Sequence, residues 1–225
     1  LPKLTAKLDQ LHRAGHPGRV LRVCGETARR TFTDPLATQD WPALHEGTLF
    51  IYALVMNRQP ILQDDSVILT PLQQDEFEEL LAVASDPLIW AQHPNPDRWK
   101  REIFRTYFDG ALASGGAFMI RSKAHGNAIG STRFYDHDAQ ASEIKIGYTF
   151  FSRSQWGSGA NQRVKRLMLD YAFQHVKHVI FHVGIQNIRS RIAMQRLGAE
   201  LVGEEEVAYF GEPPKKNVVF RITAP

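Results

Sequence analysis

The stretch FFSRSQWGSGANQRVKRLMLDYAF, residues 150–173, decides how the rest of the chain is interpreted. It opens with an apolar run typical of a buried strand and ends in a segment whose apolar residues recur at helical spacing. Gly157 and Gly159 lie between the two. This arrangement favours an anionic ligand, because the first N–H groups of a helix have no partner within the helix and carry a partial positive charge. The alternative is an ordinary tight turn between a strand and a helix.

Two common phosphate-binding signatures do not match this glycine turn. A dinucleotide fingerprint requires a third glycine where Gln162 stands, and an acidic residue on the next strand where Phe181 and His182 stand. A nucleoside triphosphate loop requires Lys-Ser or Lys-Thr after its glycines, and neither pair follows here. Both readings are therefore rejected, and coenzyme A remains as the third class of anionic ligand.

The surrounding pattern predicts a mixed α/β fold with a mainly antiparallel sheet and one β-α-β crossover around the glycine turn. Prolines predict a loop at residues 86–97, and Asp97 is expected to cap the helix that follows. The short acidic run Glu204 to Glu206 is expected at a strand entrance. Strands are expected at 66–72, 117–122, 128–136, 142–151, 178–184, 206–211 and 217–223, and helices at 75–84, from 97 to the Gly115-Gly116 pair, after the glycine turn and at 190–198.

Composition and length narrow the class of protein. The chain has 225 residues, 43% of them hydrophobic and 23% charged, which is typical of a globular protein. The single cysteine, Cys24, excludes an internal disulfide framework and favours a reducing, cytoplasmic location. The apolar runs 49–56 and 179–183 are too short to cross a membrane. The net charge of +3 is scattered along the chain, so no nucleic-acid partner is predicted.

The chain is predicted to have two unequal parts. Residues 1–55 form an N-terminal extension of uncertain structure, and residues 56–225, which open at Met56, form the functional domain. Within the first part, residues 47–56 are apolar and do not distinguish a strand from a short helix.

Residues 67–223 resemble the GCN5-related N-acetyltransferase (GNAT) superfamily, in the branch of the Rim-type acetyltransferases of protein N-termini. The matching pieces are IGSTRFYD, IKIGYTFFSRSQWGSGANQ and VGIQNIRSRIAMQRLGAE, in that order. The resemblance implies an acetyl-CoA-dependent N-acetyltransferase whose acceptor is a primary amine of a protein N-terminus or a small molecule. It also implies that the following residues bind the cofactor: Phe150, Phe151, Ser152, Trp156, Gly157, Ser158, Gly159, Ala160, Asn161, Asn187 and Ser190.

The family's catalytic residues transfer only in part. Ser190 matches a position near the sulfur and is expected to act as proton donor, although it is equally placed to cap the helix 190–198. Many Rim-type members carry a Glu base where Lys145 stands here, and Glu143, two residues earlier on the same strand face, is therefore the candidate base. The alternative is that Glu143 is an exposed charge near the start of the strand. Met194 stands where many family members carry a Tyr that acts as general acid, and Ser154 stands where the family's loop begins with Gln or Arg.

Several further residues keep two interpretations. His182 is either a general base or a histidine packed in the core. No Cys or carboxylate completes a metal site with His175, His178 and His182, so no metal is predicted. Trp90 and His93 suit an aromatic wall for the acceptor, whereas Trp99 and Tyr107 suit helix packing. The departures at positions 145 and 194 leave a non-catalytic acyl-CoA-binding module as the alternative function. Monomer and homodimer both remain open.

Overall fold

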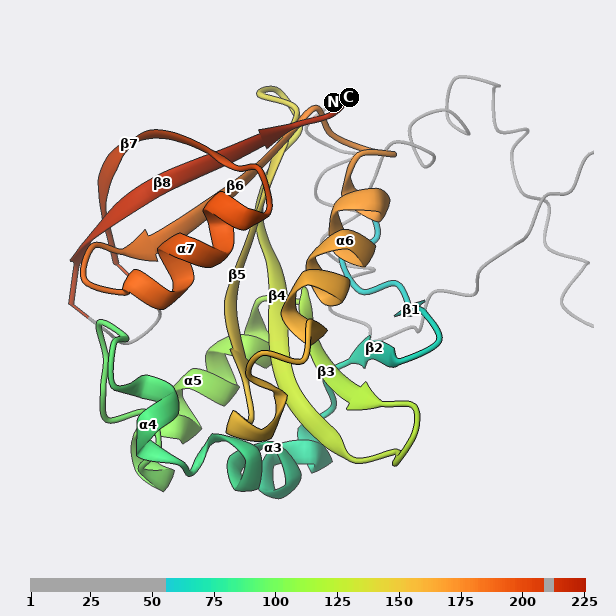
Figure 1. Cartoon of the computed structure of the whole chain (residues 1–225), viewed down its shortest axis with the longest axis vertical. Helices are drawn as coiled ribbons and strands as arrows, with labels where there is room; N and C mark the ends of the chain where they lie inside the picture. Colours follow the sequence, from blue (N-terminus) through green and yellow to red (C-terminus); the bar gives the residue numbers. More distant parts are fainter. Residues whose placement is uncertain (1–55, 209–212) are drawn as a thin grey trace, which may run out of the picture. The chain divides into compact units, whose positions relative to one another are not determined.

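The structure, a computed structural model, describes residues 56–208 and 213–225. Its centre is a sheet in which eight strands follow the order β1-β2-β3-β4-β5-β6-β8-β7 (Figure 1). Neighbouring strands are antiparallel except β5 and β6, which are parallel and joined through helix α6. The predicted mixed fold with one β-α-β crossover is therefore confirmed. The strands are β1 (Leu62–Gln63), β2 (Val67–Pro71), β3 (Ala117–Ser122), β4 (Ala128–Asp138), β5 (Glu143–Phe151), β6 (His178–Gly184), β7 (Glu200–Val207) and β8 (Lys215–Thr223).

Helices cover both faces of the sheet. Strand β3 shows the division: Phe118 and Ile120 join a core with α6, while Ala117 and Met119 join a second core with α3 and α5. Successive side chains of a strand point to opposite faces, so one strand serves both cores. The helices are α3 (Phe77–Ala84), α4 (Pro87–Trp90), α5 (Arg101–Ala113), α6 (Ala160–Ala172) and α7 (Ile188–Arg196), with 3-10 turns η1 (Gln74–Glu76) and η2 (Arg153–Gln155).

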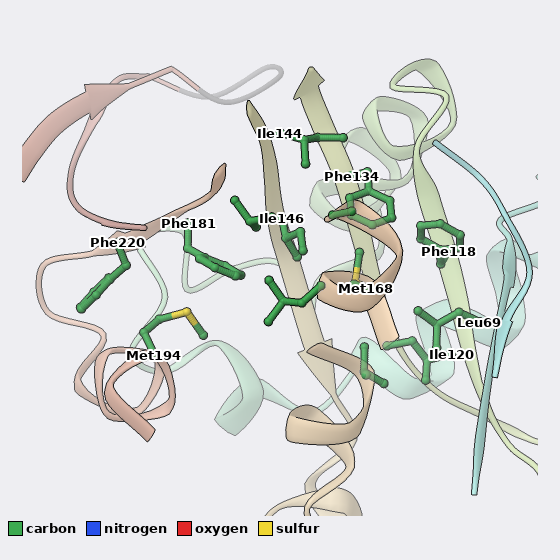
Figure 2. Close-up of a cluster of buried hydrophobic side chains, with 14 of the residues drawn as sticks. Leu69, Phe118, Ile120, Phe134, Ile144, Ile146, Met168, Phe181, Met194 and Phe220 are labelled. Carbon is green, nitrogen blue, oxygen red and sulfur yellow. The ribbon is translucent and has the colours of Figure 1, made fainter. Parts of the chain in front are cut away.

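The core beneath α6 fixes that helix against the sheet. Val164, Met168 and Ala172 are fully buried along one face of α6, as the helical spacing predicts. Figure 2 shows Met168 of α6 among side chains of β4, β5 and β6, with Met194 of α7 and Phe220 of β8 at the far side of the same cluster. The start of α6 is thereby held at the end of β5.

Strands β5 and β6 pair only along their first residues. Glu143, Ile144 and Lys145 pair with His178, Val179 and Ile180, and no later residue of β5 pairs with β6. Strand β6 instead pairs with β8 along its whole length, and Figure 1 shows β6 turning away from β5. The second half of β5 therefore has no strand on its β6 side.

A β-bulge lies where β5 has parted from β6. Ser131 pairs with Phe150 and Arg133 with Gly147, so an advance of two residues along β4 lies opposite an advance of three residues along β5. Tyr148 occupies the extra position with φ 53°, in the left-handed region. The Tyr107 hydroxyl on α5 donates a hydrogen bond of 2.8 Å to the Tyr148 carbonyl oxygen. A helix on one face thus holds the turned peptide of the bulge.

Several local expectations are wrong. The predicted loop 86–97 contains α4, which the Asp86 carboxylate caps by accepting from the Leu88 N–H at 3.0 Å. Helix α5 begins after Lys100, not at Asp97, whose carboxylate instead pairs with the Lys100 ammonium at 2.9 Å. Glu204 to Glu206 lie inside β7 rather than at its entrance, because that exposed edge strand starts at Glu200.

The predicted N-terminal extension, residues 1–55, lies outside the described residues, and so does the apolar run 47–56 apart from Met56. Within the part of the chain that the structure describes, no helix is long and apolar enough to span a membrane.

Candidate functional site

A cavity of about 800 Å³ opens where β5 and β6 part. Its walls come from the second half of β5, the glycine turn, the first turns of α6, the end of β6, helix α7, and the segment from α4 to Arg98. The cavity therefore extends along the side of β5 that lacks a neighbouring strand.

The glycine turn leads directly into α6. Gly157 and Gly159 have φ values of 77° and 84°, a region that strains other residues. A Cβ added at either position would meet no atom within 4 Å, so the turn faces open space. Gly159 is the N-cap of α6, and the first turn of that helix has no acidic residue. The partial positive charge of the helix N-terminus thus stays available to an anion.

Most of the cofactor residues predicted from the sequence line this cavity. Ser152, Ser158 and Ala160 are not among its lining residues. The Ser158 hydroxyl instead closes the turn, donating to the Gln155 carbonyl oxygen at 2.8 Å and accepting from the Ala160 N–H at 3.2 Å. The lining residues from the predicted set are Phe150, Phe151, Trp156, Gly157, Gly159, Asn161, Asn187 and Ser190.

Asn187, and not Ser190, caps α7. The Asn187 side-chain oxygen accepts from the Ser190 N–H at 3.1 Å, so Ser190 is the third residue of the helix. Asn187 is buried, and within the described residues its amide nitrogen has no hydrogen-bond partner. That N–H group is left to donate to a ligand in the cavity. Ser190 lines the same wall one helical turn later.

The structure does not bring Glu143 to the cavity. It is the first residue of β5 and pairs with His178 at the opposite end of the strand from the glycine turn. His182 lies four residues further along β6, which corresponds to about 13 Å of strand. Glu143 does share a strand face with Lys145, as expected, but strand alternation says nothing about where along the strand the cavity opens.

His182 lies in the cavity wall with a side chain that is only 2% exposed. Its Nε2 is 3.1 Å from a carboxylate oxygen of Glu205 on β7, and neither ring nitrogen has a hydrogen bond in the described residues. Burial is the main cause that lowers the pKa of His182. The Lys145 charge lowers this pKa further, and Glu205 partly offsets both effects. The ring is therefore neutral near pH 7 and able to accept a proton.

Aromatic and cationic side chains from α4 and the segment after it form the opposite wall. Trp90, His93 and Arg98 line the cavity, whereas Trp99 and Tyr107 do not. The Arg98 guanidinium lies 3.2 Å from His93 Nε2 and 5.0 Å from the centre of the Tyr107 ring. On the other side of the ring, the Asn95 backbone N–H donates to His93 Nδ1 at 2.9 Å. Burial, followed by the Arg98 charge, holds the pKa of His93 well below its usual value.

Lys165 is a cavity residue that the sequence reasoning did not single out. It lies on α6, is 3% exposed, and its ammonium donates to the Thr149 hydroxyl at 2.7 Å. A lysine at a buried helical position breaks the apolar face of Val164 and Met168, and that break was the available signal.

These residues fit coenzyme A. The helix N-terminus and the open glycine turn suit a pyrophosphate, and the free side of β5 with the Asn187 amide suits the amide groups of a pantetheine arm. Among residues 56–208 and 213–225, no group of three His, Cys, Asp or Glu side chains is placed to hold a metal ion.

Comparison with known proteins identifies the same fold. The model of the acetyltransferase (GNAT) domain matches residues 66–200. A GCN5-related N-acetyltransferase from Brucella melitensis is 22% identical, with a TM-score of 0.62 over 73% of this chain and 79% of that chain. A provisionally named ribosomal-protein-serine acetyltransferase from Vibrio cholerae is 16% identical, with a TM-score of 0.59 over 75% of this chain and 100% of that chain.

A third solved structure carries ligands. The microcin C7 self-immunity acetyltransferase, in complex with acetyl-CoA and AMP, is 13% identical, with a TM-score of 0.59 over 72% of this chain and 94% of that chain. At these identities the solved structures establish the fold alone. A search of curated proteins found no match.

Proposed function

The chain belongs to the acetyltransferase (GNAT) family, whose members use acetyl-CoA, and from this premise we propose that it is an N-acetyltransferase acting on a primary amine. The amine belongs to a protein N-terminus or to a small molecule, and it attacks the thioester directly. One cavity contains both a glycine turn suited to phosphates and a buried, neutral His182 with no hydrogen-bonded ring nitrogen. That combination carries the proposal.

The binding residues divide along the cavity. The N–H groups of Gly157, Gly159 and Asn161 would hold the pyrophosphate, and the Asn187 amide would donate to the pantetheine arm. The bulge adds a further donor. A trans peptide directs its C=O and N–H oppositely, and the Tyr148 carbonyl points to Tyr107 on α5, so the Thr149 N–H points away from α5. Acetyl-CoA itself supplies the activated acetyl group.

His182 is the proposed proton acceptor. A primary amine is mostly protonated at pH 7 and must lose a proton before it becomes a nucleophile. The neutral ring of His182 takes that proton, and the imidazolium that forms is stabilised by the Glu205 carboxylate 3.1 Å away. His182 therefore replaces Glu143 as the base in this proposal, because only His182 lines the cavity.

The acceptor enters beside α4 and the segment that follows it. Trp90 and His93 form that wall with Arg98 and with Tyr148 of the bulge, so aromatic side chains line the path of the amine. The Vibrio cholerae protein supports a peptide N-terminus as one acceptor class through its fold and name only. Small-molecule amines suit the same wall.

The test is release of free thiol from acetyl-CoA in the presence of peptide N-termini, lysine-containing peptides, amino acids and small amines. We expect turnover that depends on the amine, with one acetylated amine formed per thiol. Tight binding of acetyl-CoA with no turnover across the whole panel would instead identify an acyl-CoA-binding module. Turnover with alcohols or water but no amine would contradict the amine as acceptor.

A further inference from the structure

Lys165 places an amino group at the point where the sheet opens. It reaches β5 through its hydrogen bond of 2.7 Å to the Thr149 hydroxyl, and its Nζ lies 5.6 Å from the centre of the Phe181 ring on β6. Those two strands have already parted at these residues. Nζ therefore lies in the floor of the cavity between them, about five residues, or 7–8 Å along the helix axis, from the glycine turn.

The hydrogen bonding of this amino group is incomplete. A lysine ammonium has three N–H donors, and only the one to Thr149 has an acceptor within the described residues. The Thr149 hydroxyl lies 2.8 Å from the Thr132 hydroxyl, which donates to the Met168 sulfur at 3.5 Å. This short chain of hydroxyl groups ends inside the protein. The remaining donors of Lys165 are left for a ligand.

No charge compensates the ammonium within the described residues. The groups that face Nζ are the Thr149 hydroxyl from β5 and the Phe181 ring from β6, with the Thr132 hydroxyl of β4 behind Thr149, and all three are neutral. No carboxylate of residues 56–208 or 213–225 forms an ion pair with Lys165. Burial alone lowers the pKa of Lys165 to about 7. A buried ammonium without a counter-ion is costly, and an anion in the cavity would relieve that cost.

We propose that Lys165 is a catalytic residue of the acetyl transfer, whose ammonium pairs with the sulfur of coenzyme A as it leaves and stabilises the thiolate. This inference rests on the proposed function, which places the thioester between β5 and β6. The anion that forms in such a cavity is the thiolate.

The step balances in atoms and charge. The neutral amine nitrogen forms a bond to the acetyl carbon, and the carbon–sulfur bond breaks with its electron pair remaining on sulfur. The thiolate leaves paired with the ammonium of Lys165. One proton of the attacking ammonium goes to His182 and the second leaves to water. His182 then releases its proton to water and the thiolate takes a proton from water, so the net products are the acetylated amine, the thiol and one free proton.

A lysine suits this step better than Ser190. A thiolate beside Nζ is an opposite charge, which offsets the burial that lowers the pKa of Lys165 to about 7, and the ammonium in turn lowers the pKa of the thiol. A serine hydroxyl carries no charge, so Ser190 would donate a hydrogen bond to the sulfur with a smaller effect on the thiol pKa. Both residues line the cavity, and their roles can be separated.

The test measures the ionisation of bound coenzyme A and does not depend on turnover. The ultraviolet absorbance of the thiolate is followed as the complex of coenzyme A with the full chain is titrated with base. An ammonium nearby is expected to lower the pKa of the bound thiol by about 1–3 units from its value near 8.5. In Lys165→Met, which keeps the length of the side chain without its charge, the bound thiol should titrate at or above the value for free coenzyme A.

Binding supplies the second readout. Lys165→Met should weaken binding of coenzyme A at pH 8 by about 3- to 25-fold, the factor that a thiol pKa lowered by one to two units gives at this pH, slightly below the pKa of the free thiol. Acetyl-CoA has no thiol, so its affinity should change less than about threefold under the same reasoning. Ser190→Ala should leave the thiol pKa low, and Lys177→Met, at an exposed lysine just beyond α6, should change neither quantity.

The outcomes separate the two proposals. If coenzyme A binds to the wild type and its thiol titrates at an ordinary pKa, the role of Lys165 is wrong while the acetyltransferase proposal stands. If coenzyme A does not bind at all, both proposals fall. The wild-type titration alone decides the question should Lys165→Met not fold.

Discussion

Replacing Gly159 by Asp is the most informative change in the glycine turn. Gly159 has φ 84°, and a Cβ there meets no protein atom within 4 Å. The new carboxylate would therefore occupy open space where the proposed pyrophosphate approaches, and it would meet two negative phosphates. At a separation of about 6 Å and an effective dielectric constant of about 20–40, each pair opposes binding by about 1.4–2.8 kcal/mol.

The two pairs together predict a large loss of affinity. Their sum of about 3–5 kcal/mol corresponds to at least about a 100-fold weaker affinity for acetyl-CoA, after allowance for screening by salt. The backbone strain of a side chain at this φ costs about 1–2 kcal/mol, and an acidic residue at the N-terminus of α6 is itself favourable. The fold should therefore survive.

The assay is calorimetric titration with acetyl-CoA, with thermal unfolding measured in parallel. Gly159→Asn is the matched control, because it carries the same backbone strain and nearly the same volume without the charge. Gly126→Asp, in the hairpin between β3 and β4 at φ 71° and also in open space, tests the same change away from the cavity. Equal affinities for Gly159→Asp and Gly159→Asn would refute the reasoning.

Three further predictions concern the base and the stability of the domain. His182→Gln should lower the rate of acetyl transfer by about 10²- to 10⁴-fold, and it should abolish the fall in rate below pH 6.5 that the wild type should show. His178→Gln, on the same strand but outside the cavity, should keep the wild-type rate and its pH dependence. Met168→Ala removes a fully buried side chain and should lower the free energy of unfolding by about 2–5 kcal/mol in urea titrations; a change below 1 kcal/mol would contradict the packing of α6. The hydrogen bond with Arg121 lowers the pKa of Glu79. The Glu79 carboxylate should therefore stabilise the fold at a pH above its unfolded pKa, and this stabilisation should be lost as the pH falls through its folded pKa. The melting temperatures of the wild type and Glu79→Gln should differ at pH 7 and converge in acid.

Periodicity and turn residues predicted the architecture because they act locally. The apolar face of α6, the hairpin between β3 and β4 and the crossover from β5 to β6 all follow from side-chain spacing and glycine positions. Helix α4 was missed although its start signal is present: Asp86 caps the helix and Pro87 occupies its first position. The prolines further along the segment obscured that signal.

The site was harder to predict because it depends on tertiary placement. Spacing put Glu143 on the expected face, but only the register of β5 against β6 shows that the cavity opens at the other end. The sequence places Asn187 and Ser190 near the start of the same helix. Only the hydrogen bond between them identifies Asn187 as the cap of α7. The lysine among the apolar positions of α6 was a signal in the sequence, but its contact with Thr149 of β5 depends on the depth of α6 in the core.

The most direct test of the central claim is a single-turnover reaction with the wild-type protein and a reactive amine from the panel. Released thiol, acetylated amine and the mass of the protein are measured in the same sample. The proposed direct attack predicts one acetylated amine for each thiol released and an unchanged protein mass. An acetyl group that appears first on the protein, or thiol release without an acetylated amine, would contradict it.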